Sequence, residues 1–312
     1  MGLLADAAAG DIRSLARILT LLESRDPIGL AALDRFYPSS GAAHRIGITG
    51  PPGAGKSSLI DHLVRSYRAL DRKVAVVAVD PSSRSSGGAT LGDRIRLLDH
   101  HADANVYVRS LASRGQRGGL SAATIDVAHV LDAVGFDPIL IESMGVGQDE
   151  IDISRFVDTT ILVQVPGLGD AVQTLKAGIM EIGEIIAVNK ADRPGAAALV
   201  RDLRGMVALG HPPQAEFETW LPVVIPVSAT TGDGIAKLME SLANHSTFLR
   251  ESDQLSLRRK NAAFAEVEFL IRADLERRLT QEPHADFSQM IEAIAGRRLS
   301  PRAALDQARH QI

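Results

Sequence analysis

Apolar residues near the N-terminus recur at the spacing of an α-helix. They lie three or four residues apart, at Leu4, Ala8, Ile12, Leu15, Ile18, Leu19 and Leu22. This spacing predicts one amphipathic helix that ends before Asp26-Pro27. We therefore expect an N-terminal helical extension.

From Arg45 onward, short runs rich in β-branched residues alternate with helical stretches. The runs cover residues 45–49, 73–79, 105–108, 138–141, 159–165, 184–188 and 223–227. Such alternation predicts an α/β fold with a mostly parallel sheet and helices on both faces. After about Leu238 the strand pattern stops, and residues 258–279 carry apolar positions at helical spacing. We expect a helical extension over residues 1–43, an α/β domain over 44–248 and a C-terminal helical arm over 249–312.

Composition excludes several functional classes. The chain is 45% hydrophobic and 23% charged with a net charge of -4, so we expect neither disorder nor a nucleic-acid partner. It contains no cysteine, which excludes disulfides, thiolate metal sites and a cysteine nucleophile. Neither a leader pattern nor an apolar run of about 18 residues is present, so we expect a cytoplasmic protein without a membrane partner.

A phosphate-binding motif follows the first predicted strand. It reads Gly50-Pro51-Pro52-Gly53-Ala54-Gly55-Lys56-Ser57 and precedes a helical run that starts with Ser58. The glycines let backbone amides and the helix N-terminus face phosphate oxygens, while Lys56 supplies a positive charge. Ser57 offers a hydroxyl to Mg²⁺. The alternative is a glycine-rich turn, which the strand and helix on either side disfavour. The motif predicts a P-loop nucleotide-binding domain.

A second motif predicts which base is bound. Asn189-Lys190-Ala191-Asp192 follows an apolar run, and Ser228-Ala229-Thr230 follows another. The Asp192 carboxylate can accept from the N1–H and exocyclic amine of guanine, and the Lys190 stem can pack on the ring. We expect the Ala229 amide to bond the guanine O6. Adenine lacks both donors, so the pair predicts GTP and GDP as ligands.

Three acidic residues follow or end predicted strands. Asp80 ends one strand, Glu142 ends another, and Asp93 lies in a loop. Together with Ser57 and nucleotide oxygens, one or two of them suffice to bind Mg²⁺. The alternatives are a turn or cap role for Asp80 and a solvated loop charge for Asp93. A carboxylate at the end of a buried strand needs a partner, which favours a functional role for Glu142.

Three stretches closely resemble the MeaB/ArgK-type P-loop GTPases. They are residues 77–96, 141–153 and 165–192, within a resemblance that covers roughly residues 11–242. The resemblance implies a homodimeric chaperone of an adenosylcobalamin-dependent acyl-CoA mutase, with the C-terminal arm as a dimerisation arm. GTP binding and hydrolysis would gate cofactor loading and protect or reactivate the mutase. A cobalamin adenosyltransferase is a second implied partner.

The resemblance also implies residue roles. Lys56, Ser57, Asp80, Asp93 and Glu142 match the family's phosphate and magnesium residues. The catalytic set is then Lys56, Glu142 and the switch glycine Gly145, and the nucleotide-coupling segment runs from Pro166 to Lys176 and includes Asp170. For Asp170 and Lys176 a helix cap and a solvated charge are the plain alternatives. Gln148 is either a water-positioning residue or a polar loop residue. The family usually has Thr-Val where this chain has Ser143-Met144.

Three other functions are compatible with a P-loop. A nickel-type metallochaperone GTPase shares both motifs, but such proteins carry cysteine and histidine metal sites, and this chain has no cysteine. A kinase would need a phosphoacceptor pocket, for which the sequence shows no motif. A nucleotide-binding adaptor would bind GTP without hydrolysing it. The sequence leaves open whether the mutase acts on methylmalonyl-CoA or on an isobutyryl- or hydroxyisobutyryl-type substrate.

Overall fold

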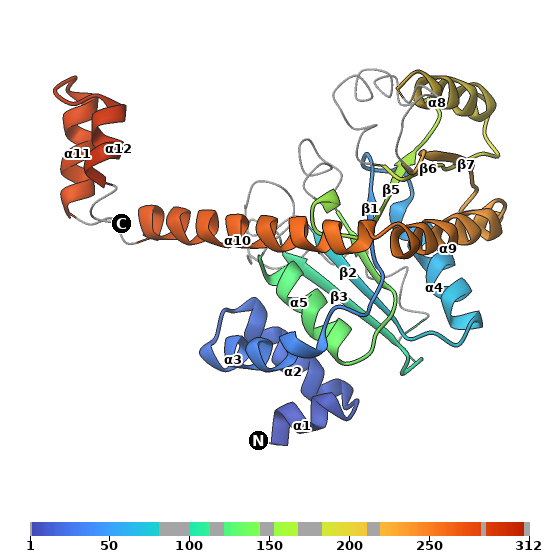
Figure 1. Ribbon diagram of the computed structural model, residues 1–312, viewed down its shortest axis with the longest axis horizontal. Coiled ribbons are helices and arrows are strands. Elements are labelled where there is room, and N and C mark those ends of the chain that lie inside the picture. Colours follow the sequence, from blue (N-terminus) through green and yellow to red (C-terminus); the bar gives the residue numbers. More distant parts are fainter. Residues whose placement is uncertain are drawn as a thin grey trace. The chain divides into compact units, whose positions relative to one another are not determined.

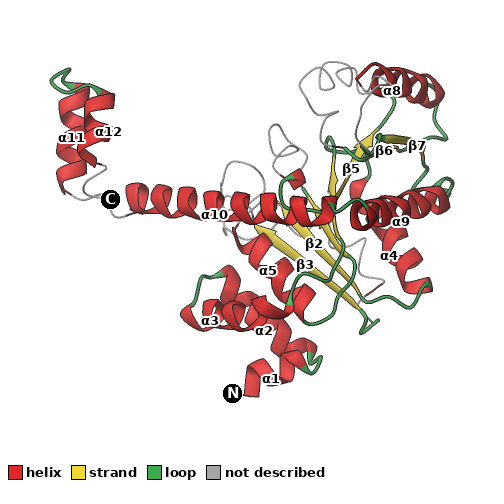
Figure 2. Cartoon of the chain, viewed as in Figure 1, coloured by secondary structure: helices red, strands yellow, loops and turns green. Residues whose placement is uncertain are grey.

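The computed structural model describes residues 2–80, 100, 102–112, 122–143, 153–167, 183–210, 219–281 and 285–308. The chain divides into two compact units, residues 1–265 and residues 266–312. The first unit contains a parallel sheet and the helices around it (Figures 1 and 2). The predicted domain limits at residues 43 and 248 remain a prediction.

The sheet has seven strands in the order β3-β2-β4-β1-β5-β6-β7, and every neighbouring pair is parallel. The strands are β1 (Arg45–Thr49), β2 (Val74–Asp80), β3 (Val106–Ala112), β4 (Ile139–Glu142), β5 (Thr159–Gln164), β6 (Ile185–Val188) and β7 (Val223–Pro226). Each lies within one or a few residues of a predicted run, so the α/β prediction is confirmed. Parallel strands put all their carboxyl ends at one edge, which is where ligands bind in such sheets.

Different helices cover the two faces of the sheet. They are α4 (Lys56–Ala69), α5 (Ala122–Ala133), α8 (Ala196–Gly210) and α9 (Ile235–Glu251). Consecutive strand residues point to opposite faces, so Ile161 and Val163 join the core beneath α4 and α9, whereas Leu162 joins the core beneath α8. Helix α5 lies on the face away from α4 (Figure 1). Both faces are buried, which explains why these strands are mostly apolar.

The N-terminal extension is helical, but the prediction of one continuous helix is wrong. It consists of α1 (Gly2–Ala8), α2 (Ile12–Glu23), α3 (Pro27–Phe36) and a short 3-10 turn over Tyr37–Ser39. The helix is interrupted at Gly10, which has a φ of 95°. Asp11 then caps α2 by accepting from the Ser14 amide at 2.8 Å. Helices α2 and α3 pack on α5.

After α9, the described part of the chain forms α10 (Gln254–Gln281), α11 (Ala285–Ala295) and α12 (Pro301–Ala308). The first turns of α10 are held against the amino-terminal ends of the strands. Arg258 pairs with Glu184 and donates to the Asp158 carbonyl at 3.1 Å, while Arg259 lies 3.6 Å from the Asp158 carboxylate. In the described part of the chain, no helix is long and apolar enough to cross a membrane.

Candidate nucleotide-binding site

The loop between β1 and α4 has a backbone that only glycine permits at two positions. Gly50 has a φ of 140°, and a Cβ there would lie 2.2 Å from the Val163 carbonyl oxygen. Gly55 has a φ of 88°, and a Cβ there would lie 2.4 Å from Asn189 Nδ2. Both positions would be strained and blocked by any side chain. The loop therefore passes close to β5 and to Asn189 of the Asn-Lys-x-Asp motif.

Lys56 begins α4 and folds back across the loop. Its ammonium donates to the Gly50 carbonyl at 2.9 Å and to the Pro51 carbonyl at 3.4 Å. The side chain is buried, with 7% of its surface exposed. An ammonium in this position can donate to an anion that enters the loop. The predicted phosphate-binding lysine thus lies inside the loop rather than in solvent.

Two predicted magnesium ligands meet at the end of the sheet. The Ser57 hydroxyl donates to Glu142 Oε1 at 3.0 Å, and both side chains are buried. They meet because β4 pairs with β1, with Glu142 in register with Ile48. Asp80 ends β2, the next strand along, but its side chain and the whole of Asp93 lie outside the described residues. An oxygen pair of this kind suits Mg²⁺, which prefers hard oxygen ligands.

Ser143, where the chain departs from the family pattern, is buried and bonded. Its hydroxyl donates to Thr49 Oγ1 at 2.8 Å, and its amide donates to the Ile48 carbonyl at 3.0 Å. The serine thus fixes the start of the segment after β4 to the end of β1. Met144, Gly145 and Gln148 lie outside the described residues.

Asn189 links the phosphate loop to the loop after β7. Its Nδ2 donates to the Ala54 carbonyl at 2.7 Å, and its Oδ1 accepts from the Ala229 amide at 3.0 Å. The side chain is buried. Lys190 adds a second link, because its ammonium donates to the Gly53 carbonyl at 2.8 Å. The phosphate motif and the predicted base motif are therefore one connected structure.

Asp192 lies at the surface beside Ser228. The Ser228 hydroxyl donates to Asp192 Oδ1 at 2.8 Å. This hydrogen bond is the main reason that the pKa of the Asp192 carboxyl lies below its ordinary value. Asp192 is therefore a charged acceptor at neutral pH, as guanine recognition requires.

The structure brings together most of the predicted nucleotide residues and adds one. Residues 50–55, 189, 190, 192 and 228–230 lie at the carboxyl ends of β1, β6 and β7 or in the loops that follow, and residues 56–58 form the start of α4. Asp170 and Lys176 lie outside the described residues. The addition is His62 on α4, whose Nε2 lies 2.9 Å from the Ala229 carbonyl oxygen. A single histidine inside a helix gives no signal in the sequence of a contact with a loop so distant along the chain.

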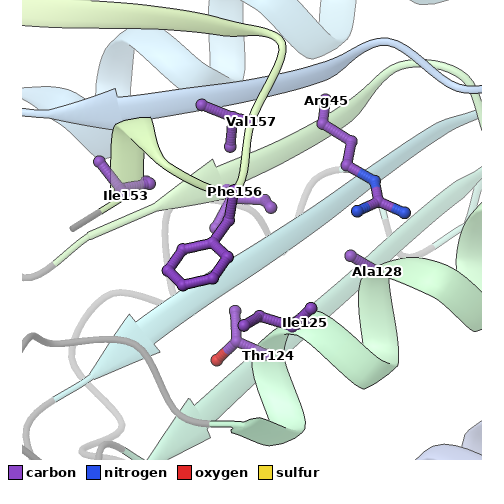
Figure 3. Close-up of a pocket in the computed structure, with 8 residues that line it drawn as sticks. Arg45, Thr124, Ile125, Ala128, Ile153, Phe156 and Val157 are labelled. Atoms are coloured by element: carbon purple, nitrogen blue, oxygen red, sulfur yellow. The ribbon is translucent and has the colours of Figure 1, made fainter. Parts of the chain in front are cut away.

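A small apolar hollow lies on the α5 face of the sheet, away from this site (Figure 3). The α5 residues Thr124, Ile125 and Ala128 line it together with the segment that precedes β5, including Phe156. In the close-up the Phe156 ring and Ile125 face each other across the gap. Among the described residues its lining is apolar apart from Arg45 and Thr124, and it includes no carboxylate. We interpret it as a packing gap beneath residues 153–157.

The parallel sheet, the glycine loop with its buried lysine and the Asn-Lys-x-Asp motif define a P-loop GTPase. The family model described as methylmalonyl-CoA mutase-associated GTPase MeaB matches residues 15–284. The chain belongs to this family, and it is accordingly a GTPase that binds guanine nucleotide.

Known proteins resemble the chain over nearly its whole length. It is 43% identical to a Pyrococcus horikoshii protein named for an inferred GTPase activity, over 97% of this chain and 95% of that protein. It is 32% identical to the GTPase ArgK of Escherichia coli, over 96% and 92% of the two chains. A mouse protein, the mitochondrial methylmalonic aciduria type A homolog, is 33% identical over 69% of this chain and 52% of its own length. The crystal structure of an LAO/AO transport system kinase superposes with a TM-score of 0.73 at 28% identity, over 98% and 95% of the chains.

Proposed function

We propose that this chain is a GTP-hydrolysing chaperone that gates adenosylcobalamin loading of an acyl-CoA mutase and protects or reactivates that mutase. The family is described as methylmalonyl-CoA mutase-associated, and the mouse relative is named for methylmalonic aciduria. The mutase acts on methylmalonyl-CoA or on a related isobutyryl- or hydroxyisobutyryl-type substrate. A cobalamin adenosyltransferase is a further proposed partner.

The observation that carries the nucleotide assignment is the double bridge made by Asn189. It joins Ala54 of the phosphate loop to Ala229 of the loop after β7. In the proposed complex the phosphates lie on residues 50–58, and the guanine lies between Lys190 and Asp192. One nucleotide then spans both loops, and the Asn189 bridge fixes the distance between the phosphate-binding loop and the base-binding loop.

Ser57 and Glu142 are the proposed core of the magnesium site, with Asp80 and Asp93 as further ligands. The fit rests on the donor set, since a hydroxyl and a buried carboxylate already meet at 3.0 Å beside the phosphate loop. Bound Mg²⁺ supplies positive charge to the phosphate oxygens. Lys56 contributes a second positive charge from inside the loop, and Gly145 is the proposed sensor of the γ-phosphate.

We place the coupling to the mutase after β5. That strand ends directly beside Gly50, because a Cβ on Gly50 would touch the Val163 carbonyl. A segment that leaves the sheet there starts next to the phosphate loop. Asp170 and Lys176 follow in this segment and are the proposed charges that change partners between the GDP and GTP states. Such a segment can transmit the state only through contacts that differ between the two.

The homodimer proposal rests on α10, whose surface carries large apolar side chains at helical spacing. The exposed ones are Leu257, Phe264, Val267, Leu270 and Ile271, and Phe264 is 72% exposed. Leu257, Phe264 and Ile271 are seven residues apart, so they follow one side of the helix. Exposed apolar surface of this kind is usually covered by a partner. Light scattering of Phe264→Glu and Ile271→Glu tests this, because both are expected to yield monomers.

The mutase proposal is tested with the purified chain and a candidate adenosylcobalamin-dependent mutase. GTP hydrolysis is measured with and without the mutase, and cofactor transfer is measured with GDP, GTP and a non-hydrolysable analogue. We expect stimulated hydrolysis and a transfer step that depends on the nucleotide. Equal hydrolysis in both cases, with transfer independent of nucleotide, would contradict the chaperone role.

Nothing in the described part of the chain favours the nickel-type alternative. Among those residues, no group of three histidine, cysteine, aspartate or glutamate side chains is placed to bind a metal ion together. The binding of Zn²⁺ or Ni²⁺ by the purified protein would be the observation in its favour.

A further inference from the structure

We propose that His62 is a positioning residue for guanine recognition, acting through the backbone of Ala229. The inference rests on the proposed nucleotide site and adds a residue to it. His62 Nε2 lies 2.9 Å from the Ala229 carbonyl oxygen. A carbonyl oxygen can only accept, so Nε2 carries the hydrogen and donates. The contact joins two parts of the chain that are 167 residues apart.

Helix α4 gives His62 a rigid base. The side of the helix that carries Leu59, Ile60 and Leu63 is fully buried in the core. The same helix starts with Lys56 and Ser57, so it also carries the phosphate and magnesium residues. A group that accepts a hydrogen bond from α4 is therefore held in a fixed position relative to the phosphate site.

What His62 holds is the loop that should read guanine O6. Both backbone polar groups of Ala229 are engaged, the amide with Asn189 and the carbonyl with His62. The loop also packs on the imidazole, since a Cβ on Gly232 would lie 3.7 Å from His62 Cε1. Asn189 is tied to the phosphate loop, and His62 belongs to the helix that follows that loop. Ala229 is thus oriented from two sides by the element that binds phosphate.

The orientation of the Ala229 amide affects the contact with one ligand atom, guanine O6. The Ala229 amide donates to Asn189 Oδ1 in this structure and is the proposed donor to guanine O6 when the nucleotide binds, whereas Asp192 reads the N1–H and the exocyclic amine. Without His62 the Ala229 carbonyl loses its hydrogen bond to α4, so the backbone at Ala229 must be ordered when guanine binds, which costs affinity. The loss should therefore appear with purines that carry a 6-oxo group. It should not appear with purines that lack this group.

Two variants separate the hydrogen bond from the bulk of the side chain. His62→Leu removes the donor and keeps a good helix former, while His62→Gln retains an N–H donor on a flexible chain. Affinities are measured for GDP, IDP and 2-aminopurine riboside diphosphate, which lacks the 6-oxo group and is fluorescent. We expect His62→Leu to weaken GDP and IDP by the same factor, about three- to tenfold, as the loss of one hydrogen bond predicts. Binding of the 2-aminopurine nucleotide should be unchanged, and His62→Gln should recover GDP affinity to within about twofold.

Two results would overturn the role of His62. One is unchanged GDP affinity in His62→Leu. The other is an equal fall for all three nucleotides together with a lower unfolding temperature, which would identify a merely structural residue. Failure of the underlying site looks different, because the wild-type protein would then show no preference for GDP over ADP. That outcome would overturn the nucleotide assignment and, with it, this role.

Discussion

Ser57 donates a hydrogen bond to Glu142 although the two residues are 85 positions apart in the chain. Ser57 lies at the start of the helix after β1, and Glu142 ends β4, the neighbouring strand. The pairing of these strands alone brings a hydroxyl and a carboxylate to one point beside the phosphate loop. This is the geometry on which a magnesium-dependent reaction would depend.

Glu142→Gln tests that geometry. The substitution keeps the size and a hydrogen-bond acceptor for Ser57 but removes the negative charge. We expect GTP turnover to fall by at least about tenfold and the Mg²⁺ concentration for half-maximal activity to rise, because a carboxylate attracts the cation much better than an amide does. Hydrolysis is measured across a Mg²⁺ series. Glu251→Gln, at the exposed C-terminus of α9, is the matched control. An unchanged Mg²⁺ dependence in Glu142→Gln would remove Glu142 from the site.

Asp192→Asn should change which base is bound. The carboxylate accepts from the N1–H and amine of guanine, whereas an amide can donate to the C2 carbonyl of xanthine. We expect GTP affinity to fall by about 100-fold or more and xanthosine triphosphate to become the better ligand, since the two guanine donors lose a charged acceptor. Competition binding with the two nucleotides decides this. Asp202→Asn on the exposed side of α8 should leave the preference for GTP intact.

Lys176→Ala tests the coupling segment. If Lys176 exchanges partners with the nucleotide state, its loss should leave intrinsic GTP affinity within about twofold. The stimulation of hydrolysis by the mutase and the nucleotide dependence of cofactor transfer should both fall. Intrinsic and stimulated hydrolysis are measured side by side, with Asp170→Ala as a second variant. Full stimulation and gated transfer in both variants would remove this segment from the mechanism.

Acid should destabilise the fold through two buried histidines at the start of the sheet. Thr159 Oγ1 lies 2.7 Å from His44 Nε2 and 2.8 Å from His245 Nδ1. Burial lowers the pKa of His245 to about 3, and it lowers the pKa of His44 as well. The unfolded chain therefore binds more protons than the folded chain below about pH 6.5, and stability falls as the pH falls from there.

The measurement is the free energy of unfolding by urea between pH 7 and pH 4.5. One histidine contributes a slope of at most about 1.4 kcal/mol per pH unit, so His245→Gln should reduce the wild-type slope by up to that amount. Identical slopes in wild type and His245→Gln would contradict the assignment.

Much of the fold could be predicted because each strand is recognisable from its own local sequence. The strands of a parallel sheet covered on both faces are short apolar runs, and all seven runs became strands. The N-terminal extension was harder to predict. Leu4 to Leu22 keep helical spacing across Gly10, so periodicity alone did not reveal the break that its positive φ imposes.

The candidate site divides in the same way. The sequence by itself determined the phosphate loop, the guanine motif and the acidic residues, because each depends on side-chain chemistry at fixed local spacing. Tertiary structure alone decided that Ser57 meets Glu142, that Asn189 bridges Ala54 and Ala229, and that His62 holds the Ala229 carbonyl. These contacts join residues 40 to 167 positions apart. The order of the strands and the packing of α4 create these contacts, and neither can be predicted from the local sequence pattern.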